Sequence, residues 1–185
     1  ACIRLTDARQ NDVWEVRKAG FGLLMSRPGD EQPYEFVEDA SVGADKLFDY
    51  INRVHEVFAS EGVTESGHYA HASVGCLHIR PVLNLKKGSD VARMRRIADG
   101  VSSLVLEFGG AMTGEHGDGI IRSEWIAKMY GPTIVRAFRE IKNAFDPGGI
   151  LNPGKIVDPW PMTENLRYGE GYETTPVKTY LDYDA

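Results

Sequence analysis

The chain has 185 residues, with 21 lysines and arginines against 27 aspartates and glutamates, and its net charge is −6. This balance gives no basic surface of the kind that binds nucleic acid, and no apolar run approaches the roughly 20 residues that span a bilayer. Hydrophobic residues make up 42% of the chain, which predicts a folded globular protein. Two cysteines are too few for a disulfide framework and favour a reducing, cytoplasmic location, with peripheral attachment to a membrane left open.

The first half of the chain predicts two helices and two extended segments. Alternating residues predict a short strand over Cys2–Leu5, and a patchy apolar face predicts a helix over Asp12–Leu24. An extended segment is expected over Glu35–Val42. Apolar residues at three- and four-residue spacing predict a stronger helix over Leu47–Phe58, which Gly62 ends.

The middle of the chain predicts a hairpin followed by the longest helix. Strands are expected over His68–Ala72 and Cys76–Val82, joined near Gly75. Apolar residues on one face predict a helix over Asp90–Phe108, and two glycines close it before the segment Ala111–Gly119. Strands that pair as hairpins beside helices indicate an α+β fold, in which helices pack on one face of an antiparallel, ferredoxin-like sheet.

The last third predicts two shorter helices and a tail. The helices are expected over Ser123–Met129, with Ser123 as the cap, and over Pro132–Phe145. No periodicity survives from Asp158 to Ala185, which predicts an extended tail or a linker. We therefore divide the chain into a domain over residues 1–157 and a tail over 158–185. The chain has neither an initiator Met nor a secretory signal, and we expect it to be a piece of a longer protein.

Two segments carry an unusual concentration of reactive side chains. His71 and His78 flank the Gly-containing turn of the predicted hairpin, and Glu115 lies in the glycine-rich segment. Two imidazoles and a carboxylate are ligands for zinc, manganese or iron, and they leave coordination positions open for a substrate. The alternative is that these are ordinary strand histidines with satisfied hydrogen bonds. We expect the two segments to meet and to form one metal site.

His116 follows Glu115 directly, and adjacent side chains point in different directions. One residue can therefore hold a metal while the other faces a substrate, and an imidazole titrates near neutral pH. His116 is thus the expected catalytic base. The alternative is a glycine-rich loop whose polar side chains only cap local backbone groups.

Two arginines and one asparagine are candidates for binding substrate and cofactor. Arg80 follows His78 by two residues on the same strand face, and a guanidinium suits bidentate binding of a substrate carboxylate. Arg17 is a second candidate for the same role, although most arginines are solvated surface residues. Asn152 lies in a rigid, proline-rich turn from Asp146 to Lys155, where its side chain could meet a cofactor edge, or the turn could simply stop a helix.

Three motifs follow one another along the chain: His71 to His78, Glu115-His116-Gly117, and Asp146 to Lys155. In combination and in this order they resemble the C-terminal region of the FAD-linked oxidases of the vanillyl-alcohol oxidase superfamily. More narrowly, they resemble the dehydrogenases of D-lactate, glycolate and D-2-hydroxyglutarate. The resemblance implies that His71, His78 and Glu115 bind the metal and that His116 takes the substrate hydroxyl proton. It also implies that Arg17 holds the substrate carboxylate, that Asn152 lies near the flavin, and that hydride passes to FAD.

The chain departs from the family pattern between the two histidines. The commoner text there is Gly-Asp-Gly-Asn-Leu-His, whereas this chain has Ser-Val-Gly-Cys-Leu-His from Ser73 to His78. That version resembles large members in which an iron–sulfur region follows the flavin half, so the tail would connect to such a cluster-binding region. Arg80 could then meet a second substrate carboxylate, which favours D-2-hydroxyglutarate over D-lactate.

The resemblance also implies partners that this chain does not contain. Most of the FAD would be bound by an N-terminal domain of the same polypeptide, because no Gly-rich nucleotide-binding unit follows a strand here. Association into a homo-oligomer is left open. Two rival hypotheses are a flavin-free metal-dependent hydrolase that uses the same ligands, and a non-catalytic partner-binding module that kept the fold.

Overall fold

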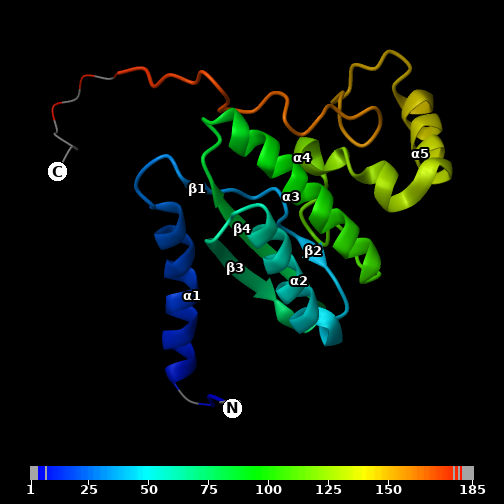
Figure 1. The fold of residues 1–185 in the computed structure, drawn as a ribbon. Helices are drawn as coiled ribbons and strands as arrows, with labels where there is room; N and C mark the ends of the chain where they lie inside the picture. Colours follow the sequence, from blue (N-terminus) through cyan, green and yellow to red (C-terminus); the bar gives the residue numbers. More distant parts are fainter. Residues whose placement is uncertain (1–3, 7, 177, 179, 181–185) are drawn as a thin grey trace.

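The computed structural model describes residues 4–6, 8–176, 178 and 180. Small strands and longer helices alternate in it, and Figure 1 gives their arrangement. The helices are α1 (Arg9–Met25), α2 (Leu47–Ser60), α3 (Gly88–Glu107), α4 (Gly119–Ser123) and α5 (Ile126–Phe145), with short 3-10 turns at Ala44–Lys46 and Ala72–Val74. The strands are β1 (Gln32–Pro33), β2 (Ala40–Ser41), β3 (Ser66–His71) and β4 (Cys76–Leu83).

Strand β4 is the centre of the antiparallel sheet. It pairs with β3 along one side, where His71 lies opposite Cys76 and Tyr69 opposite His78. Along its other side it pairs with β2 near its start and with β1 near its end. This arrangement confirms the α+β class and the predicted hairpin. The strand expected over Cys2–Leu5 is absent from its described residues 4 and 5, and residues 2 and 3 lie outside the described part of the chain.

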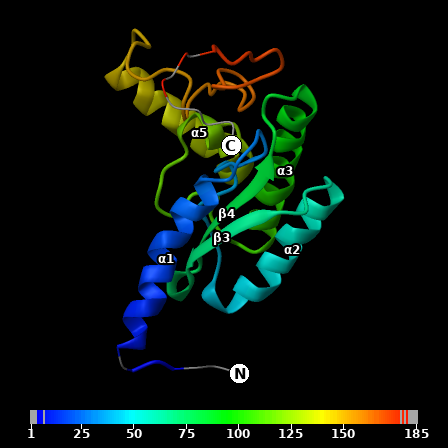
Figure 2. The same ribbon diagram turned by 90° about the vertical axis from the view of Figure 1, so that its left-hand side faces the viewer.

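Helices α2 and α3 cover one face of the sheet, and Figure 2 shows them on the side opposite α1. Alternation along β4 turns Leu77, Ile79 and Leu83 into the core that these helices close. The helices contribute a continuous apolar stripe, including Tyr50, Val54, Phe58, Met94, Ile97, Val101 and Val105. The apolar residues of α2 and of α3 recur at helical spacing in the sequence. For this reason both predicted helices agree with the structure to within two residues at each end.

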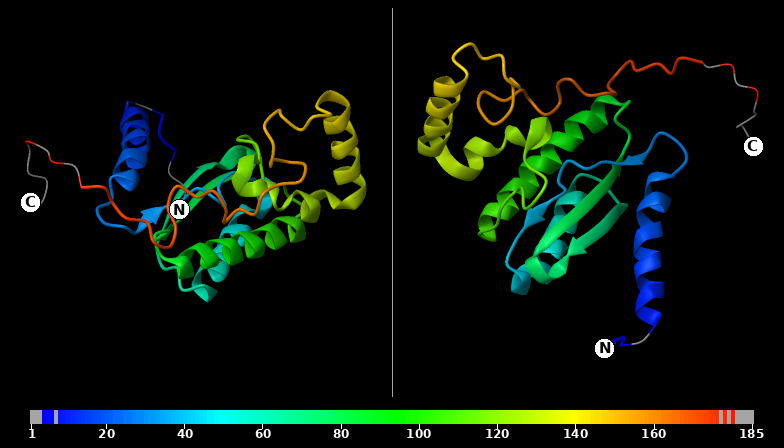
Figure 3. Two further views of the ribbon diagram at one scale, coloured as in Figure 1. Left: turned by 90° about the horizontal axis from the view of Figure 1, so that it is seen from above. Right: turned by 180° about the vertical axis from the view of Figure 1, so that it is seen from behind.

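Helix α1 lies against the other face of the sheet by its last turns only. The rings of Phe21 and Tyr69 meet edge to face at 6.4 Å, and Leu24 fills the space beside Gly67. None of its described residues is buried, and Val13, Trp14 and Val16 are more than half exposed. The helix thus touches the sheet at one end and projects from it at the other (Figure 3).

The C-terminal third differs in two details from the sequence prediction. Ser123 ends α4 and does not cap the following helix, which begins at Ile126. That helix is interrupted at Gly131, where φ is +75°, so the predicted break between Met129 and Pro132 is confirmed. The Ser123 hydroxyl instead accepts the backbone N–H of Ile156 at 2.9 Å. The described part of the tail has no helix or strand, as expected, yet Met162 is fully buried against the core. No helix in the described part of the chain is long and apolar enough to cross a membrane.

Candidate metal and substrate site

The β3–β4 hairpin presents two imidazoles on the sheet face opposite α2 and α3. The register pairs His71 with Cys76, two residues before His78, so both histidines project to the same side. Their ring centroids lie 5.2 Å apart, with the planes nearly perpendicular. Gly75 makes the turn between them at φ +73°, and a Cβ there would lie 1.8 Å from the carbonyl oxygen of Val42. Only glycine fits this position.

The glycine-rich segment lies along β2 as an additional extended stretch. Ala111 and Ser41 exchange two backbone hydrogen bonds at 2.9 Å, and the N–H of Gly114 donates to the carbonyl of Asp39 at 2.7 Å. A Cβ at Gly114 would lie 2.1 Å from the Ser41 hydroxyl, so a side chain there would push the segment away. The close approach delivers Glu115 and His116 to the hairpin.

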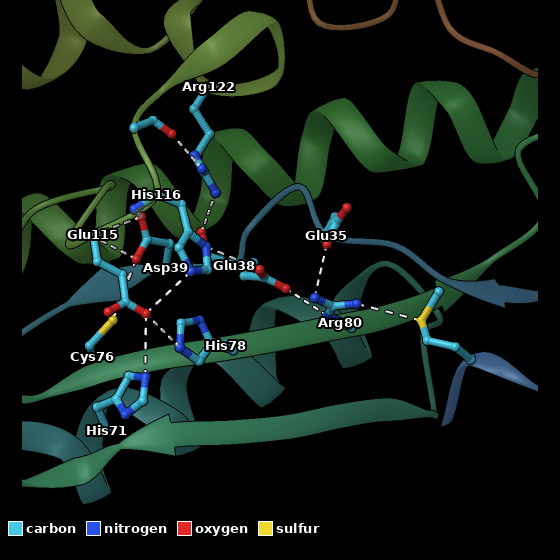
Figure 4. Close-up of polar contacts among 12 residues, drawn as sticks. Glu35, Glu38, Asp39, His71, Cys76, His78, Arg80, Glu115, His116 and Arg122 are labelled. Carbon is cyan, nitrogen blue, oxygen red and sulfur yellow. Dashed lines mark hydrogen bonds and ion pairs between the residues drawn. The ribbon is translucent and has the colours of Figure 1, made fainter. Parts of the chain in front are cut away.

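Three imidazoles surround one carboxylate oxygen, as Figure 4 shows. The Oε1 atom of Glu115 lies 3.4 Å from Nε2 of His71, 3.0 Å from Nε2 of His78 and 3.2 Å from Nε2 of His116. The rings of His78 and His116 are stacked, with 4.9 Å between centroids. The two predicted segments therefore meet in space. Among the described residues, two overlapping groups of donor atoms could hold a metal ion: Asp39, Cys76, His78 and Glu115, and Glu38, His78 and His116. His71 contacts Glu115 but belongs to neither group, so its role as a ligand stays a prediction.

Burial shifts the pKa values of two residues at this cluster, His78 and Cys76. Desolvation lowers the pKa of His78 against the opposing pull of Glu38 and Glu115, so the neutral imidazole that ligates metals is favoured. Its Nδ1 atom is buried and has no hydrogen-bond partner among the residues that the structure describes. Desolvation also raises the pKa of the buried Cys76 thiol, which favours its protonated form.

Asp39 holds the Glu115–His116 segment in place, and sequence reasoning did not single it out. Its carboxylate is fully buried and accepts the backbone N–H of Glu115 at 2.9 Å and of His116 at 2.7 Å. Its backbone adopts φ +80°, a conformation that aspartate tolerates better than most residues. A pair of acids inside the apolar run Phe36–Val42 was the available signal, because buried carboxylates need partners.

Glu38 orients the predicted base. Its Oε1 lies 3.2 Å from Nδ1 of His116, and its Oε2 accepts from Nε of Arg80 at 2.6 Å. Carboxylates therefore flank both ring nitrogens, Glu38 at Nδ1 and Glu115 at Nε2, and together they fix the orientation of the imidazole. Glu38 is the second contributor that the sequence reasoning missed.

Arg80 lies beside the cluster, but its guanidinium is already occupied. It is buried, it pairs with Glu38 and with Glu35 at 2.9 Å, and it stacks over Phe21 at 4.8 Å. The substrate-binding role expected for Arg80 thus stays a prediction, in competition with two carboxylates of the protein itself.

Arg17 and Asn152 do not join the cluster in this chain. Arg17 is exposed on the projecting part of α1, with its guanidinium over Trp14 at 6.0 Å. Asn152 lies in the loop after α5, where it lines a separate cavity with Phe138 and Phe145. Their expected contacts, with substrate and with flavin, stay predictions about a larger assembly.

A cavity of about 540 Å³ adjoins His116, which forms part of its lining. Its wall includes Glu38, Arg122 from α4 and the tail residue Arg167. The Arg122 guanidinium donates to the carbonyls of Glu38 at 2.6 Å and Gly117 at 2.5 Å, which ties α4 to the site. A volume of this size is typical of small-molecule sites.

Comparison with known proteins gives the family of the chain. Residues 3–156 match the family described as FAD linked oxidases, C-terminal domain. The chain belongs to this family. It is 37% identical over 159 residues to the D-2-hydroxyglutarate dehydrogenase of Pseudomonas putida, and 36% identical over 147 residues to that of Escherichia coli. A D-lactate dehydrogenase of Anaerostipes hadrus is 32% identical over 152 residues.

The FAD-linked oxidase domain covers only part of these relatives. The matches span 86%, 80% and 82% of this chain but 16%, 14% and 31% of the three relatives' own lengths. The resemblance to this family that the sequence motifs indicated is confirmed. The matched segment holds the histidines, Glu115 and the acids that contact them.

Proposed function

We propose that this chain is the substrate- and metal-binding part of an FAD-dependent dehydrogenase that oxidises a D-2-hydroxy acid, D-2-hydroxyglutarate or D-lactate, to the 2-oxo acid. The observation that carries the proposal is the convergence of three imidazole Nε2 atoms within 3.4 Å of one Glu115 oxygen. His116 alone of these three is also anchored at Nδ1 by a buried carboxylate, Glu38. On this basis we assign His71 and His78 the role of ligands and His116 the role of base.

The protein's own residues would bind the cation and move one proton. His71, His78 and Glu115 would hold a zinc, manganese or iron ion through the atoms that converge. A bound divalent cation supplies a positive charge beside the substrate's 2-hydroxyl oxygen, and FAD supplies the acceptor for the hydride of C2. His116 would take the hydroxyl proton at Nε2, and Glu38 would stabilise the imidazolium that results.

The remaining partners follow from the same proposal. FAD would be bound mainly by an N-terminal domain of the same polypeptide, and residues 158–185 would continue towards a region that could carry an iron–sulfur cluster. The names of the P. putida and E. coli relatives favour D-2-hydroxyglutarate as the substrate. Asp39 would fix where Glu115 and His116 stand by accepting their backbone N–H groups, and its carboxylate also lies in a donor group with Cys76, His78 and Glu115 that could hold a metal ion.

The test uses the full-length, FAD-loaded protein. The rate of flavin reduction by D-2-hydroxyglutarate and by D-lactate is measured by stopped flow, and the metal content of each variant is determined as well. We expect His116→Gln to lower the reduction rate by about 10²- to 10⁴-fold with the metal retained, since a general base contributes this much. His71→Ala should lose metal. His55→Gln is the matched control, because His55 pairs with His68 on a different part of the surface.

Each rival would give a different result. Hydrolytic activity that needs metal but not flavin would favour the hydrolase. A partner-binding module would bind no metal, and His116→Gln would then leave the rate of flavin reduction unchanged. Flavin reduction at the wild-type rate in His116→Gln would contradict the proposed base.

A further inference from the structure

We infer that the cavity beside His116 binds the second carboxylate of a dicarboxylic 2-hydroxy acid, and that Arg167 is the residue that selects it. This inference rests on the proposed function and adds a specificity determinant to it. The cavity reaches from His116 and Glu38 to Arg167, so a substrate whose hydroxyl meets His116 would extend its other end towards the tail.

The wall of this cavity combines apolar side chains with two cations. Phe36, Leu85, Met94 and Ile121 line it and would contact the methylene groups of a short chain. Arg122 and Arg167 supply the positive charges. Apolar walls with a few charged groups at fixed points are the usual composition of a site for a small organic acid.

The two arginines keep charge available for an anion. Arg122 donates to two carbonyl oxygens, which carry no formal charge, and it makes no ion pair among residues that the structure describes. Its buried Nε atom has no hydrogen-bond partner. Arg167 also forms no ion pair within the described chain, and its guanidinium lies over the ring of Tyr168 at 5.4 Å. An anion in the cavity would be the missing counter-charge.

The acids that share this wall are already compensated. Glu38 faces Arg80 and His116, and Glu35 pairs with Arg80 at 2.9 Å. They would therefore repel a substrate carboxylate less than free acids would. The same pairs occupy the guanidinium of Arg80, so the role that the sequence suggested for Arg80 is better met by Arg167.

Arg167 is positioned by the segment around it. Met162 is fully buried, and its N–H donates to the carboxylate of Glu124 at 2.9 Å. Leu166 and Tyr168 pack against the core on either side of Arg167. In Figure 1 this orange segment crosses the top of α3 before the tail leaves the domain. Residue 167 lies beyond the family match, which ends at residue 156, so specificity here would come from an extension of the shared domain.

The experiment compares two substrates in the full-length, FAD-loaded enzyme. Arg167→Ala should lower the ratio of kcat/KM for D-2-hydroxyglutarate to that for D-lactate by about 10- to 100-fold, the effect of losing a charge-assisted hydrogen bond. The loss should fall on KM, and Arg167→Lys should restore part of it. Arg136→Ala, an exposed arginine of α5 that does not line the cavity, should leave both values unchanged. Arg122 is unsuitable for the test because it also ties α4 to Glu38.

A binding measurement separates this inference from the proposed chemistry. The affinities of the same proteins for 2-oxoglutarate and for pyruvate are measured by calorimetric titration. Arg167→Ala should weaken the affinity for 2-oxoglutarate by about 10- to 100-fold and leave the affinity for pyruvate unchanged. An unchanged substrate ratio together with unchanged 2-oxoglutarate affinity would overturn the role of Arg167. A wild-type protein that oxidises neither acid would instead refute the proposed function, whereas Arg167-dependent binding of 2-oxoglutarate would still support the dicarboxylate site.

Discussion

The carboxylate of Asp39 positions the candidate site without touching a substrate. It accepts the backbone N–H groups of Glu115 and His116, and its own carbonyl accepts that of Gly114. An asparagine would offer one acceptor and present an NH₂ group to one of these donors. We expect Asp39→Asn to lower the metal affinity of the full-length protein by about 10- to 100-fold, the usual cost of losing support behind a ligand.

Competition with a chelator measures this affinity. Asp49→Asn, an exposed aspartate in the first turn of α2, is the control and should bind metal as the wild type does. Equal metal affinity in Asp39→Asn and wild type would show that the Glu115–His116 segment needs no buried carboxylate.

Arg80 shows how burial changes the value of an ion pair. Its side chain is 10% exposed and that of Glu38 is 6% exposed, so removal of the cation leaves an uncompensated charge in the interior. We expect Arg80→Met to lower the free energy of unfolding of this chain by about 3–5 kcal/mol in urea. Arg53→Met removes an exposed pair with Glu107 and should cost far less. Similar losses in both variants would contradict this explanation.

The hairpin between β3 and β4 depends on one turn residue. Gly75 and Gly62 share φ +73°. A Cβ at Gly75 would clash with the carbonyl oxygen of Val42, whereas a Cβ at Gly62 would have no atom within 4 Å apart from those of the adjoining residues. We expect Gly62→Ala to cost about 1 kcal/mol for the left-handed backbone alone. Gly75→Ala should cost about 2–4 kcal/mol, because the added methyl must displace the neighbouring backbone.

Chemical denaturation of both variants of the chain gives these two values. The Gly75→Ala hairpin should also present His71 and His78 in altered positions, so its metal binding in the full-length protein should fall while that of Gly62→Ala persists. Equal losses of stability would show that the backbone conformation, and not the contact with Val42, sets the requirement for glycine.

The elements were predictable where the signal is local. The apolar stripe of α3 and the alternation along β4 specify which side of each element is buried. The Gly-containing turn between His71 and His78 indicated that the hairpin would bring their rings together. Motif order also placed Glu115 and His116 at the same point. Each of these inferences uses residues within one element or one loop.

The rest of the site depends on long-range packing that no local pattern encodes. Asp39 contacts Glu115 and His116, which follow it by 76 and 77 positions in the sequence. Arg122 contacts Glu38, which precedes it by 84 positions. The sequence predicted an extended segment over 35–42, but only Ala40–Ser41 forms a strand, and the chain bends and turns over residues 36–39. No local pattern indicated that its acids would turn towards the glycine-rich loop. Burial of Met162 was missed for the same reason, since a single apolar residue in an aperiodic tail gives no period to detect.

At the scale of the whole molecule, α1 has an apolar surface that this chain does not cover. Val13, Trp14 and Val16 are 55%, 57% and 73% exposed, and the helix touches the sheet only near its end. The relatives named D-2-hydroxyglutarate dehydrogenases are about six to seven times longer than the segment they share with this chain. Exposed apolar side chains gathered on one helix are typical of a surface that another domain covers.

We therefore expect the rest of the full-length protein to pack on α1, and hydrogen exchange provides the measurement. Amides of residues 9–20 should exchange quickly in the 185-residue chain, because an isolated helix of this length is marginal in water. The same amides should be strongly protected in the full-length protein. Amides of α3 are the internal control and should be protected in both, since α3 packs on the core. Fast exchange of α1 in the full-length protein would show that no other domain covers this helix, and it would leave Arg17 without the contact that its predicted role requires.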